Sequence, residues 1–285
     1  MNKGTAILLV SCPDQKGLVA AISQFIYSNN GNIVHSDQHT DQEKGIFIIR
    51  IEWELDGFKL SKDELPKKFF PITDKFNMNW ELRFSDYVPK LAIMVSTYDH
   101  CLYDLLLRKH SGELNVDIPL IISNHPDLKH ISDSFNISYH VVPKDKSNKL
   151  EQENTELSLL KNAHVDFIVL ARYMQVLSPA FILNFSNRII NIHHSFLPAF
   201  LGSKPYTQAY ERGVKIIGAT SHFITDELDA GPIIEQQVEK VSHRDTVDDL
   251  IRKGRDLERI VLAKAVRLYL QNRILIYGNK TVVFD

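Results

Sequence analysis

Two short segments in the second half of the chain contain the residue types that acyl chemistry requires. The segment RIINIHHSFLP begins as an apolar run and then provides an amide, two imidazoles and a hydroxyl at Asn191, His193, His194 and Ser195. The segment SHFITDELDAGP provides a carboxylate at Asp229. An amide and a charged imidazole can donate hydrogen bonds to a developing oxyanion, and a carboxylate can take a proton from water. Asn191, His193 and Asp229 together favour direct attack on an acyl carbon, without a covalent enzyme intermediate.

The spacing within the first segment indicates which side chains act together. Along an extended strand, side chains two residues apart point to the same face, and adjacent side chains point to opposite faces. We therefore expect Asn191 and His193 to face one substrate atom and His194 to point away from it. Aspartate before a glycine turn is common for conformational reasons alone, so the assignment of Asp229 depends on its lying close to His193.

The first segment belongs to a region in which apolar strands alternate with helices. The expected strands are KLAIMVST, DIPLIISN, YHVVP, VDFIVLA and RIINIHH, with helices beginning near residues 100, 126, 149 and 178. Continuous apolar runs are typical of strands buried on both faces, as in a parallel sheet covered by helices. Ligands bind beyond the carboxyl ends of such strands, which is where Asn191 and His193 lie. A long amphipathic helix from about residue 245 and a hairpin complete the chain.

The N-terminal part of the chain follows a different pattern. Apolar or alternating segments predict strands at residues 6–12, 32–40, 45–55 and 77–85, and helical spacing predicts helices at 17–29 and 61–70. The order is βαββαβ, which is typical of an α+β sandwich of one sheet and two helices. The sequence therefore predicts two domains, residues 1–86 and 87–285, with a short boundary near Tyr87-Val88-Pro89.

Composition narrows the class of ligand. The formal net charge is -2, with 33 basic and 35 acidic residues, so the chain lacks the positive field that nucleic acid or an anionic membrane would need. A small molecule is the expected ligand. Cys12 and Cys101 are too few for a disulfide framework or a four-thiolate zinc site. The apolar run before Ser11 is too short for a signal core or a membrane span, so we expect a cytoplasmic protein.

Three spaced segments, LARYMQVLSPAF, NIHHSFLP and SHFITDELDAGPII, resemble the folate-dependent formyltransferases. That family includes glycinamide ribonucleotide transformylase and methionyl-tRNA formyltransferase, and the resemblance covers about residues 88–285. It implies a Rossmann-like α/β domain with a mostly parallel sheet. It also implies that Asn191, His193 and Asp229 are the catalytic amide, imidazole and carboxylate, and that His194, Ser195 and His222 support them.

The same resemblance implies the folate site and the reaction partners. The implied folate contacts are Arg172, Tyr173, Met174, Gln175, Val176, Leu177, Ile224, Thr225 and Asp226. The folate, 10-formyltetrahydrofolate, is the substrate, and no further cofactor and no metal ion are expected.

The segment after the first strand of this region indicates the acceptor. Family members that act on a ribonucleotide hold its phosphate in a glycine-rich loop at this position, because backbone N–H groups must approach the anion closely. Here the segment is STYDHCLYD, without glycine. In HCLYDLL and PYTQAYERGVKIIGAT the chain resembles the members that pass the formyl group to water. The expected activity is hydrolysis of a linear amide C–N bond, which gives formate and tetrahydrofolate. The formate would supply one-carbon and purine metabolism.

The segment CPDQKGLVAAI resembles the ACT domains, which adopt a ferredoxin-like βαββαβ fold. In that family the turn and the subunit interface can bind a small amino acid and adjust the activity of the attached enzyme. The resemblance implies a homo-oligomer and an effector site at Asp14, Gly17, Leu18 and Asn32. Glycine or methionine is the expected effector, because both belong to the metabolism of one-carbon units.

Three other functions are compatible with parts of this pattern. A formyltransferase acting on an amine would share every catalytic residue and differ only in its acceptor site. A metal-dependent amide hydrolase would use His193, His194, His222 and Asp229 as ligands, but adjacent histidines on a strand diverge and no HExxH motif is present. A non-enzymatic amino-acid sensor is disfavoured because all three catalytic residue types are retained.

Overall fold

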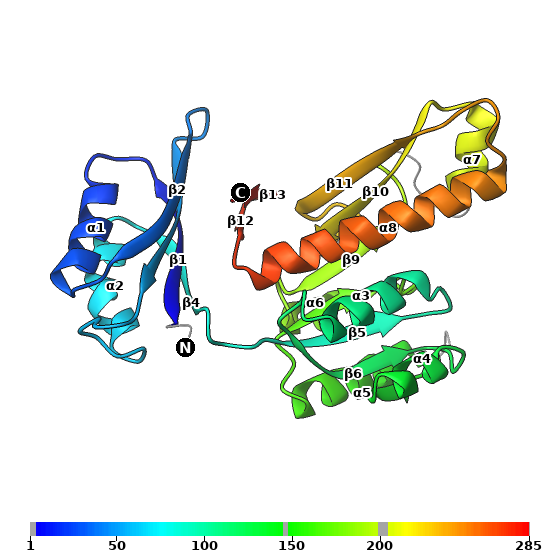
Figure 1. Ribbon diagram of the computed structural model, residues 1–285, viewed down its shortest axis with the longest axis horizontal. Helices are drawn as coiled ribbons and strands as arrows, with labels where there is room; N and C mark the ends of the chain where they lie inside the picture. The colour runs from blue at the N-terminus through cyan, green and yellow to red at the C-terminus, as the bar shows by residue number, and fades with distance from the viewer. Residues whose placement is uncertain (1–3, 145–147, 199–204, 285) are drawn as a thin grey trace. The chain divides into compact units, whose positions relative to one another are not determined.

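The computed structural model describes residues 4–144, 148–198 and 205–284, and its N-terminal part confirms the predicted βαββαβ order. The elements are β1 (Thr5–Pro13), α1 (Leu18–Ser28), β2 (Ile33–Asp41), β3 (Ile46–Glu54), α2 (Leu65–Lys75) and β4 (Asn79–Phe84). The strands pair in the antiparallel order β2-β3-β1-β4, and both helices lie on one face of this sheet (Figure 1). Leu8 and Val10 of β1 face the helices, as the alternation of a strand requires.

The opposite face of this sheet is covered by the end of the chain. Leu9 and Ile48 form an apolar cluster with Leu275 of β12 (Ile274–Tyr277) and with Phe284, which follows β13 (Lys280–Val283). The described residues therefore divide into two compact units. The first contains the residues up to Val88, Gln271–Gly278 and the chain from Val282; the second contains Pro89–Leu270 and Asn279–Thr281. The sequence had assigned the hairpin to the second domain, because its pattern does not indicate which sheet it covers.

The second unit contains the predicted mostly parallel sheet. Its strands are β5 (Lys90–Val95), β6 (Asp117–Ser123), β7 (Ser138–Val141), β8 (Phe167–Leu170), β9 (Ile189–His193), β10 (Ile216–Phe223) and β11 (Ile233–Lys240). They pair in the order β11-β10-β9-β8-β5-β6-β7, and the pairs from β9 to β7 are parallel. The strand order reverses between β5 and β8, which is the position where doubly wound sheets bind ligands.

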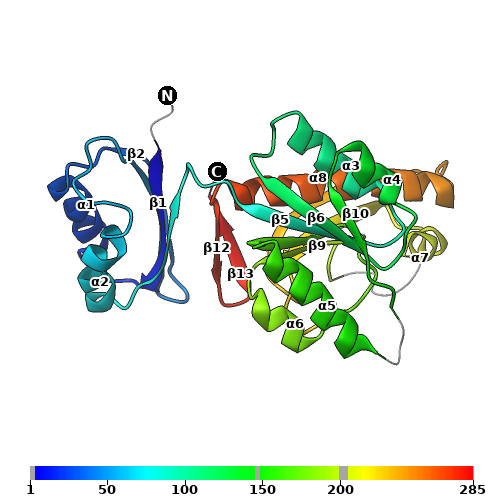
Figure 2. The same cartoon turned by 90° about the horizontal axis from the view of Figure 1, so that it is seen from below.

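Helices cover both faces of this second sheet. They are α3 (His100–His110), α4 (Lys129–Ser134), α5 (Lys149–Asn162), α6 (Pro179–Asn184), α7 (Pro205–Arg212) and α8 (Val247–Leu270). Helices α3 and α8 pack against each other on one face, and α5 and α6 cover the other (Figure 2). No helix in the part of the chain that the structure describes is long and apolar enough to span a membrane.

Both cysteine thiols are free and buried, Cys12 in β1 and Cys101 in α3. Burial raises the pKa of Cys12 to about 11 and raises the pKa of Cys101 well above its ordinary value. Since the thiolate is the reactive form, we expect the native protein at pH 8 to react with a disulfide reagent at least about tenfold more slowly than the denatured protein. Thiol titration with and without guanidinium checks this expectation. Rapid labelling of either cysteine in the native protein would contradict it.

Candidate active site

The end of β9 and the neighbouring strand β10 bring the first catalytic candidates together. In the antiparallel ladder, His222 of β10 lies directly opposite Asn191. Nδ2 of Asn191 donates to Nε2 of His222 over 3.2 Å, and Nδ1 of His222 donates to the Phe223 carbonyl oxygen over 2.9 Å. A ring nitrogen that accepts beside one that donates defines a neutral imidazole. Burial lowers the pKa of His222 in agreement with that state, so His222 orients the Asn191 amide.

The carboxylate of Asp229 lies beside His193. Its Oδ1 is 3.3 Å from Nδ1 of His193 and 3.7 Å from Nε2 of His222. The hydrogen bond from His193 outweighs partial burial and holds the pKa of Asp229 below its ordinary value. Asp229 is therefore ionised at neutral pH and can accept a hydrogen bond from Nδ1–H of His193.

A tight loop after β10 places this carboxylate. Asp229 has a φ of 55°, in the left-handed region that aspartate tolerates better than most residues. Two residues later, a Cβ at Gly231 would lie 1.8 Å from the carbonyl oxygen of Phe223. Glycine at 231 therefore allows the loop to pack directly on the end of β10, next to His222.

The second ring nitrogen of His193 is buried and unpaired within the described part of the chain. His193 is buried, and its Nε2 has no hydrogen-bond partner among the residues described here. Buried polar atoms are normally paired, so an unpaired nitrogen on an imidazole whose other nitrogen faces a carboxylate is a candidate for a substrate contact. The structure thus brings Asn191, His193 and Asp229 together.

The prediction that His194 points away from His193 is wrong. The two rings stack, with centroids 4.8 Å apart and an interplanar angle of 19°. Strand geometry ends at His193, and the chain bends over the next residues, so the alternation of an extended strand does not continue. Ser195 supports this bend, because its carbonyl oxygen accepts a hydrogen bond from Thr220 Oγ1 over 2.9 Å.

The predicted folate segment, residues 172–177, follows β8 and divides into two sets. Tyr173 and Leu177 pack in the hydrophobic core, and the Tyr173 hydroxyl donates to Glu156 over 2.6 Å. Met174 and Val176 are exposed, and Gln175 is half-buried. Side chains of the second set can contact a ligand directly, whereas Tyr173 and Leu177 can offer only backbone atoms.

The remaining folate candidates follow β10. Ile224 packs against the core cluster and its N–H donates to the carbonyl of Ile189, and Thr225 Oγ1 donates to the Glu227 carbonyl. Asp226 is exposed. These residues begin the loop that carries Asp229, and the hydrogen bond of Ile224 places the start of this loop beside Ile189, the first residue of β9.

The four effector candidates do not lie together in one chain. Asp14 and Gly17 follow the Pro13 end of β1, whereas Asn32 donates to Glu54, which pairs with Thr5 at the other end of that strand. The two ends are separated by roughly 25 Å, the length of such a strand. Leu18 is buried in the core and has no side-chain surface for a ligand.

A buried polar cluster beside the site was not predicted. Glu258 of α8 accepts hydrogen bonds from His100 Nε2 and the Tyr206 hydroxyl, both over 2.8 Å, and lies 3.4 Å from Nε of Arg172. Glycine at 254 allows this approach, because a Cβ there would lie 2.0 Å from the Tyr206 hydroxyl. The signal in the sequence is a glutamate on the apolar stripe of α8, since buried carboxylates are rare unless paired.

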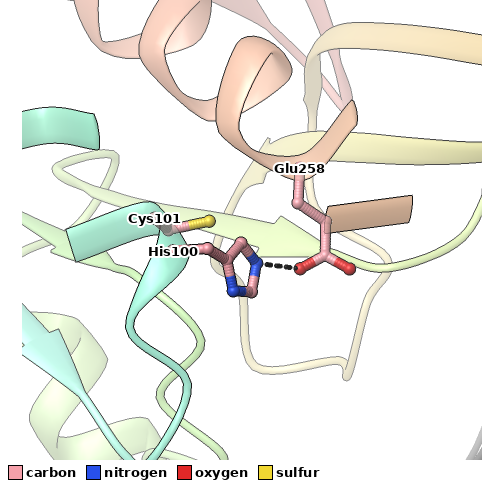
Figure 3. Close-up of side chains that lie close together, drawn as sticks. All are labelled: His100, Cys101 and Glu258. Atoms are coloured by element: carbon pink, nitrogen blue, oxygen red, sulfur yellow. Dashed lines mark hydrogen bonds and ion pairs between the residues drawn. The ribbon is translucent and has the colours of Figure 1, made fainter. Parts of the chain in front are cut away.

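The donor set does not favour a metal site in this cluster. Ligand atoms of His100, Cys101 and Glu258 lie within 4.8 Å of one another (Figure 3). However, burial raises the pKa of the Cys101 thiol, which opposes the ionisation that metal binding requires. The Arg172 guanidinium also neutralises the Glu258 carboxylate. The same arginine donates to Nδ1 of His194 over 2.6 Å, which disfavours the metal site that the sequence left open at His193, His194, His222 and Asp229.

A mostly parallel sheet with an amide, an imidazole and a carboxylate at one edge, joined to a βαββαβ unit, defines a formyltransferase-fold enzyme with an ACT domain. The formyl transferase family matches residues 89–266, and the ACT domain family matches residues 6–52. The chain is 61% identical to formyltetrahydrofolate deformylase of Synechocystis sp. over 284 residues, covering 100% of both chains. It is 47% identical to the enzyme of that name from Bacillus subtilis, covering 100% of this chain and 95% of that one. The chain belongs to the formyltetrahydrofolate deformylase family.

Solved structures agree with this assignment. A crystal structure of a formyltetrahydrofolate deformylase from Pseudomonas syringae pv. tomato superposes with a TM-score of 0.97 at 45% identity, covering 100% of this chain and 96% of that one. Glycinamide ribonucleotide transformylase 1 from Symbiobacterium toebii superposes with a TM-score of 0.66 at 28% identity, covering 72% of this chain and 98% of that one. The similarity to deformylases thus includes both domains.

Proposed function

We propose that the protein hydrolyses 10-formyltetrahydrofolate to formate and tetrahydrofolate. The observation that carries the proposal is the arrangement of Asn191, His193 and Asp229, in which the buried Nε2 of His193 has no hydrogen-bond partner among the described residues. The full-length similarity to deformylases supports the same reaction.

In the proposed reaction, Asp229 orients a water molecule and takes its proton as the oxygen attacks the formyl carbon. The side chain of Asp229 is 14% exposed, so water can reach it. Protonated His193 donates from Nε2 to the formyl oxygen, and the second N–H of the Asn191 amide donates to the same oxyanion. The C–N bond then breaks, N10 of the folate receives the proton held by Asp229, and formic acid leaves and loses its remaining proton to solvent to give formate.

Water as the acceptor is supported by the start of α3. In a ribonucleotide-specific relative, the helix after the first strand would present backbone N–H groups to a phosphate. Here the first residue of that helix, His100, is bound to the buried carboxylate of Glu258. Because this position holds an imidazole–carboxylate pair and residues 96–104 contain no glycine, transfer to an amine on a phosphorylated acceptor is disfavoured.

The test is incubation of the pure protein with 10-formyltetrahydrofolate in buffer without an added amine. We expect formate and tetrahydrofolate to form in a one-to-one ratio. Release that depends on an added amine, with the formyl group recovered on that amine, would support the formyltransferase alternative instead.

We also propose that the enzyme acts in the cytoplasm, where formate supplies one-carbon and purine metabolism. Free cysteines, which persist in a reducing compartment, support this location. The residues proposed to contact the folate are those at 172–177 and 224–226, through the exposed side chains of Met174 and Val176 and through backbone atoms.

The ACT unit is proposed to form a homo-oligomer and to bind glycine or methionine. Because Asp14 and Asn32 lie at opposite ends of the sheet, a site that uses both requires a second chain. We expect one of these amino acids to change the rate of formate release and to raise the melting temperature, as a ligand specific for the folded state does. Rate measurements and thermal scans with each free amino acid, together with light scattering for the oligomeric state, check this. No effect of any amino acid would contradict the proposal.

A further inference from the structure

Glu258 is a buried charge that the proposed reaction does not use. The residue is 1% exposed, and each of its oxygens accepts a hydrogen bond, from His100 and from Tyr206. Burial alone would raise the pKa of Glu258, but the hydrogen bond from His100 and the charge of Arg172 outweigh burial and lower it. The carboxylate is therefore ionised inside the protein, where an ion persists only with several partners. Figure 3 shows the His100 ring turned toward it.

Arg172 links this carboxylate to the active site. Its Nε lies 3.4 Å from Glu258 Oε2, and its Nη1 lies 2.6 Å from Nδ1 of His194. The backbone of Arg172 is also held, with a φ of 63° and its carbonyl oxygen accepting from the N–H of Ser96 at the end of β5. The arginine is thus fixed at the point where the strand order of the sheet reverses.

The contact with Arg172 determines the protonation state of His194. A guanidinium group can only donate hydrogen bonds, so Nδ1 of His194 must accept, and the ring proton resides on Nε2. The ring of His194 stacks on that of His193 at 4.8 Å. Two charged imidazoles at that distance, beside an arginine, would repel each other. A neutral His194 adds no positive charge beside His193, which the proposed reaction uses in its protonated form and whose Nδ1 faces Asp229.

We propose that Glu258 is a positioning residue that anchors Arg172, and that Arg172 in turn fixes the place and the neutral tautomer of His194, against which His193 packs. The proposal rests on the proposed function of Asn191, His193 and Asp229. Glu258 does not contact the formyl group. Its loss changes the orientation of His193, which affects the transition state more than folate binding.

The main test is a cycle of Glu258→Gln, His194→Gln and the double variant, with kcat and KM for formate release measured for each. Glutamine keeps the size of the side chain but offers Arg172 no negative charge. We expect Glu258→Gln to lower kcat about 10- to 100-fold, the scale of a small misplacement of a catalytic group, while KM changes less than about threefold. If Glu258 acts through His194, the two losses of kcat are not multiplied in the double variant. Its kcat then lies within about twofold of that of the slower single variant. Multiplicative losses, or a loss confined to KM, would overturn the proposal.

Glu153→Gln is the matched control. Glu153 is a glutamate of α5 with 3% exposure that accepts hydrogen bonds from Ser178 and, among the described residues, forms no hydrogen bond or ion pair with Arg172 or His193. We expect this variant to retain kcat within about twofold, as a substitution outside the catalytic network does. An equal loss of kcat in Glu153→Gln and Glu258→Gln would mean that any buried charge in this unit has the same effect, and would overturn the specific role of Glu258.

A second readout does not depend on the reaction. In protein labelled with ¹⁵N-histidine, the ring shifts report which nitrogen carries the proton, and the His194→Gln variant identifies the signals of His194. We expect an unprotonated Nδ1 in the wild type and a mixture of states in Glu258→Gln. If the wild type releases no formate, the proposed function fails while this measurement still tests the network. An unchanged His194 tautomer in Glu258→Gln would overturn the inference even if formate is released.

Discussion

Asp229→Asn is expected to lower the rate of formate release at least about 10³-fold, because the asparagine amide cannot take a proton from the attacking water. It also removes the negative charge that lies 3.3 Å from Nδ1 of His193. The variant should fold normally, since asparagine has nearly the same shape and tolerates the φ of 55° at this position. Single-turnover formate release, with circular dichroism as the check on folding, measures the effect.

Two further variants make this result specific. Asn191→Ala removes one oxyanion donor and is expected to lower kcat about 10²- to 10³-fold. Glu227→Gln changes an exposed carboxylate in the same loop and should leave kcat within about twofold. Wild-type rates in Asp229→Asn or Asn191→Ala would remove these residues from the mechanism.

The second large effect is expected for Gly231→Ala. The new methyl group would lie 1.8 Å from the Phe223 carbonyl oxygen, so the loop must move away from β10 and carry Asp229 with it. We expect kcat to fall more than about tenfold, as displaced catalytic groups cause, and the free energy of unfolding to decrease by about 1–3 kcal/mol. Steady-state kinetics and urea unfolding measure both quantities.

Gly4→Ala is the control for this glycine. A Cβ at Gly4 would lie 3.5 Å from the Asp86 side chain, which is an ordinary van der Waals contact. The substitution should therefore leave both rate and stability close to those of the wild type. If Gly231→Ala behaves like Gly4→Ala, the close approach of the loop to β10 does not position Asp229.

The pH dependence of stability gives an independent check on the ion pair. Because the folded state lowers the pKa of Asp229 below 3.8, its ionised form stabilises the fold above that pH. This contribution is lost as the pH falls through the lower folded-state pKa. We expect the wild type to lose free energy of unfolding relative to Asp229→Asn as the pH decreases below about 4, and urea unfolding from pH 5 to 3 measures the difference. A difference that does not vary with pH in this window would contradict the ion pair.

Local patterns were sufficient to predict the elements that position the site. Alternation and apolar runs are properties of a few consecutive residues, and they predicted the βαββαβ order and the parallel strands that carry Asn191 and His193. The prediction for His194 was wrong because it assumed that the strand continued past His193. Where a strand stops depends on what the next residues contact, which the pattern does not contain.

Local sequence patterns could not predict contacts between segments that are far apart in the chain. Glu258 and His100 are 158 residues apart in the sequence, and Glu258 and Tyr206 are 52 apart. Helical spacing places position 258 on the buried stripe of α8, but it does not indicate which side chains neutralise a carboxylate there. The same reason explains the assignment of the C-terminal hairpin, whose apolar residues fit more than one sheet.

The pairing of β10 with β9 has a practical consequence for handling this protein. Since His222 lies opposite Asn191 in that ladder, a slip by one residue would turn the histidine toward the other face of the sheet and leave the amide without its partner. Misregistered molecules would be compact yet inactive. Specific activity therefore reports the fraction of correctly paired chains in a refolded preparation. Measurements of size or secondary-structure content alone would not reveal the incorrectly paired chains.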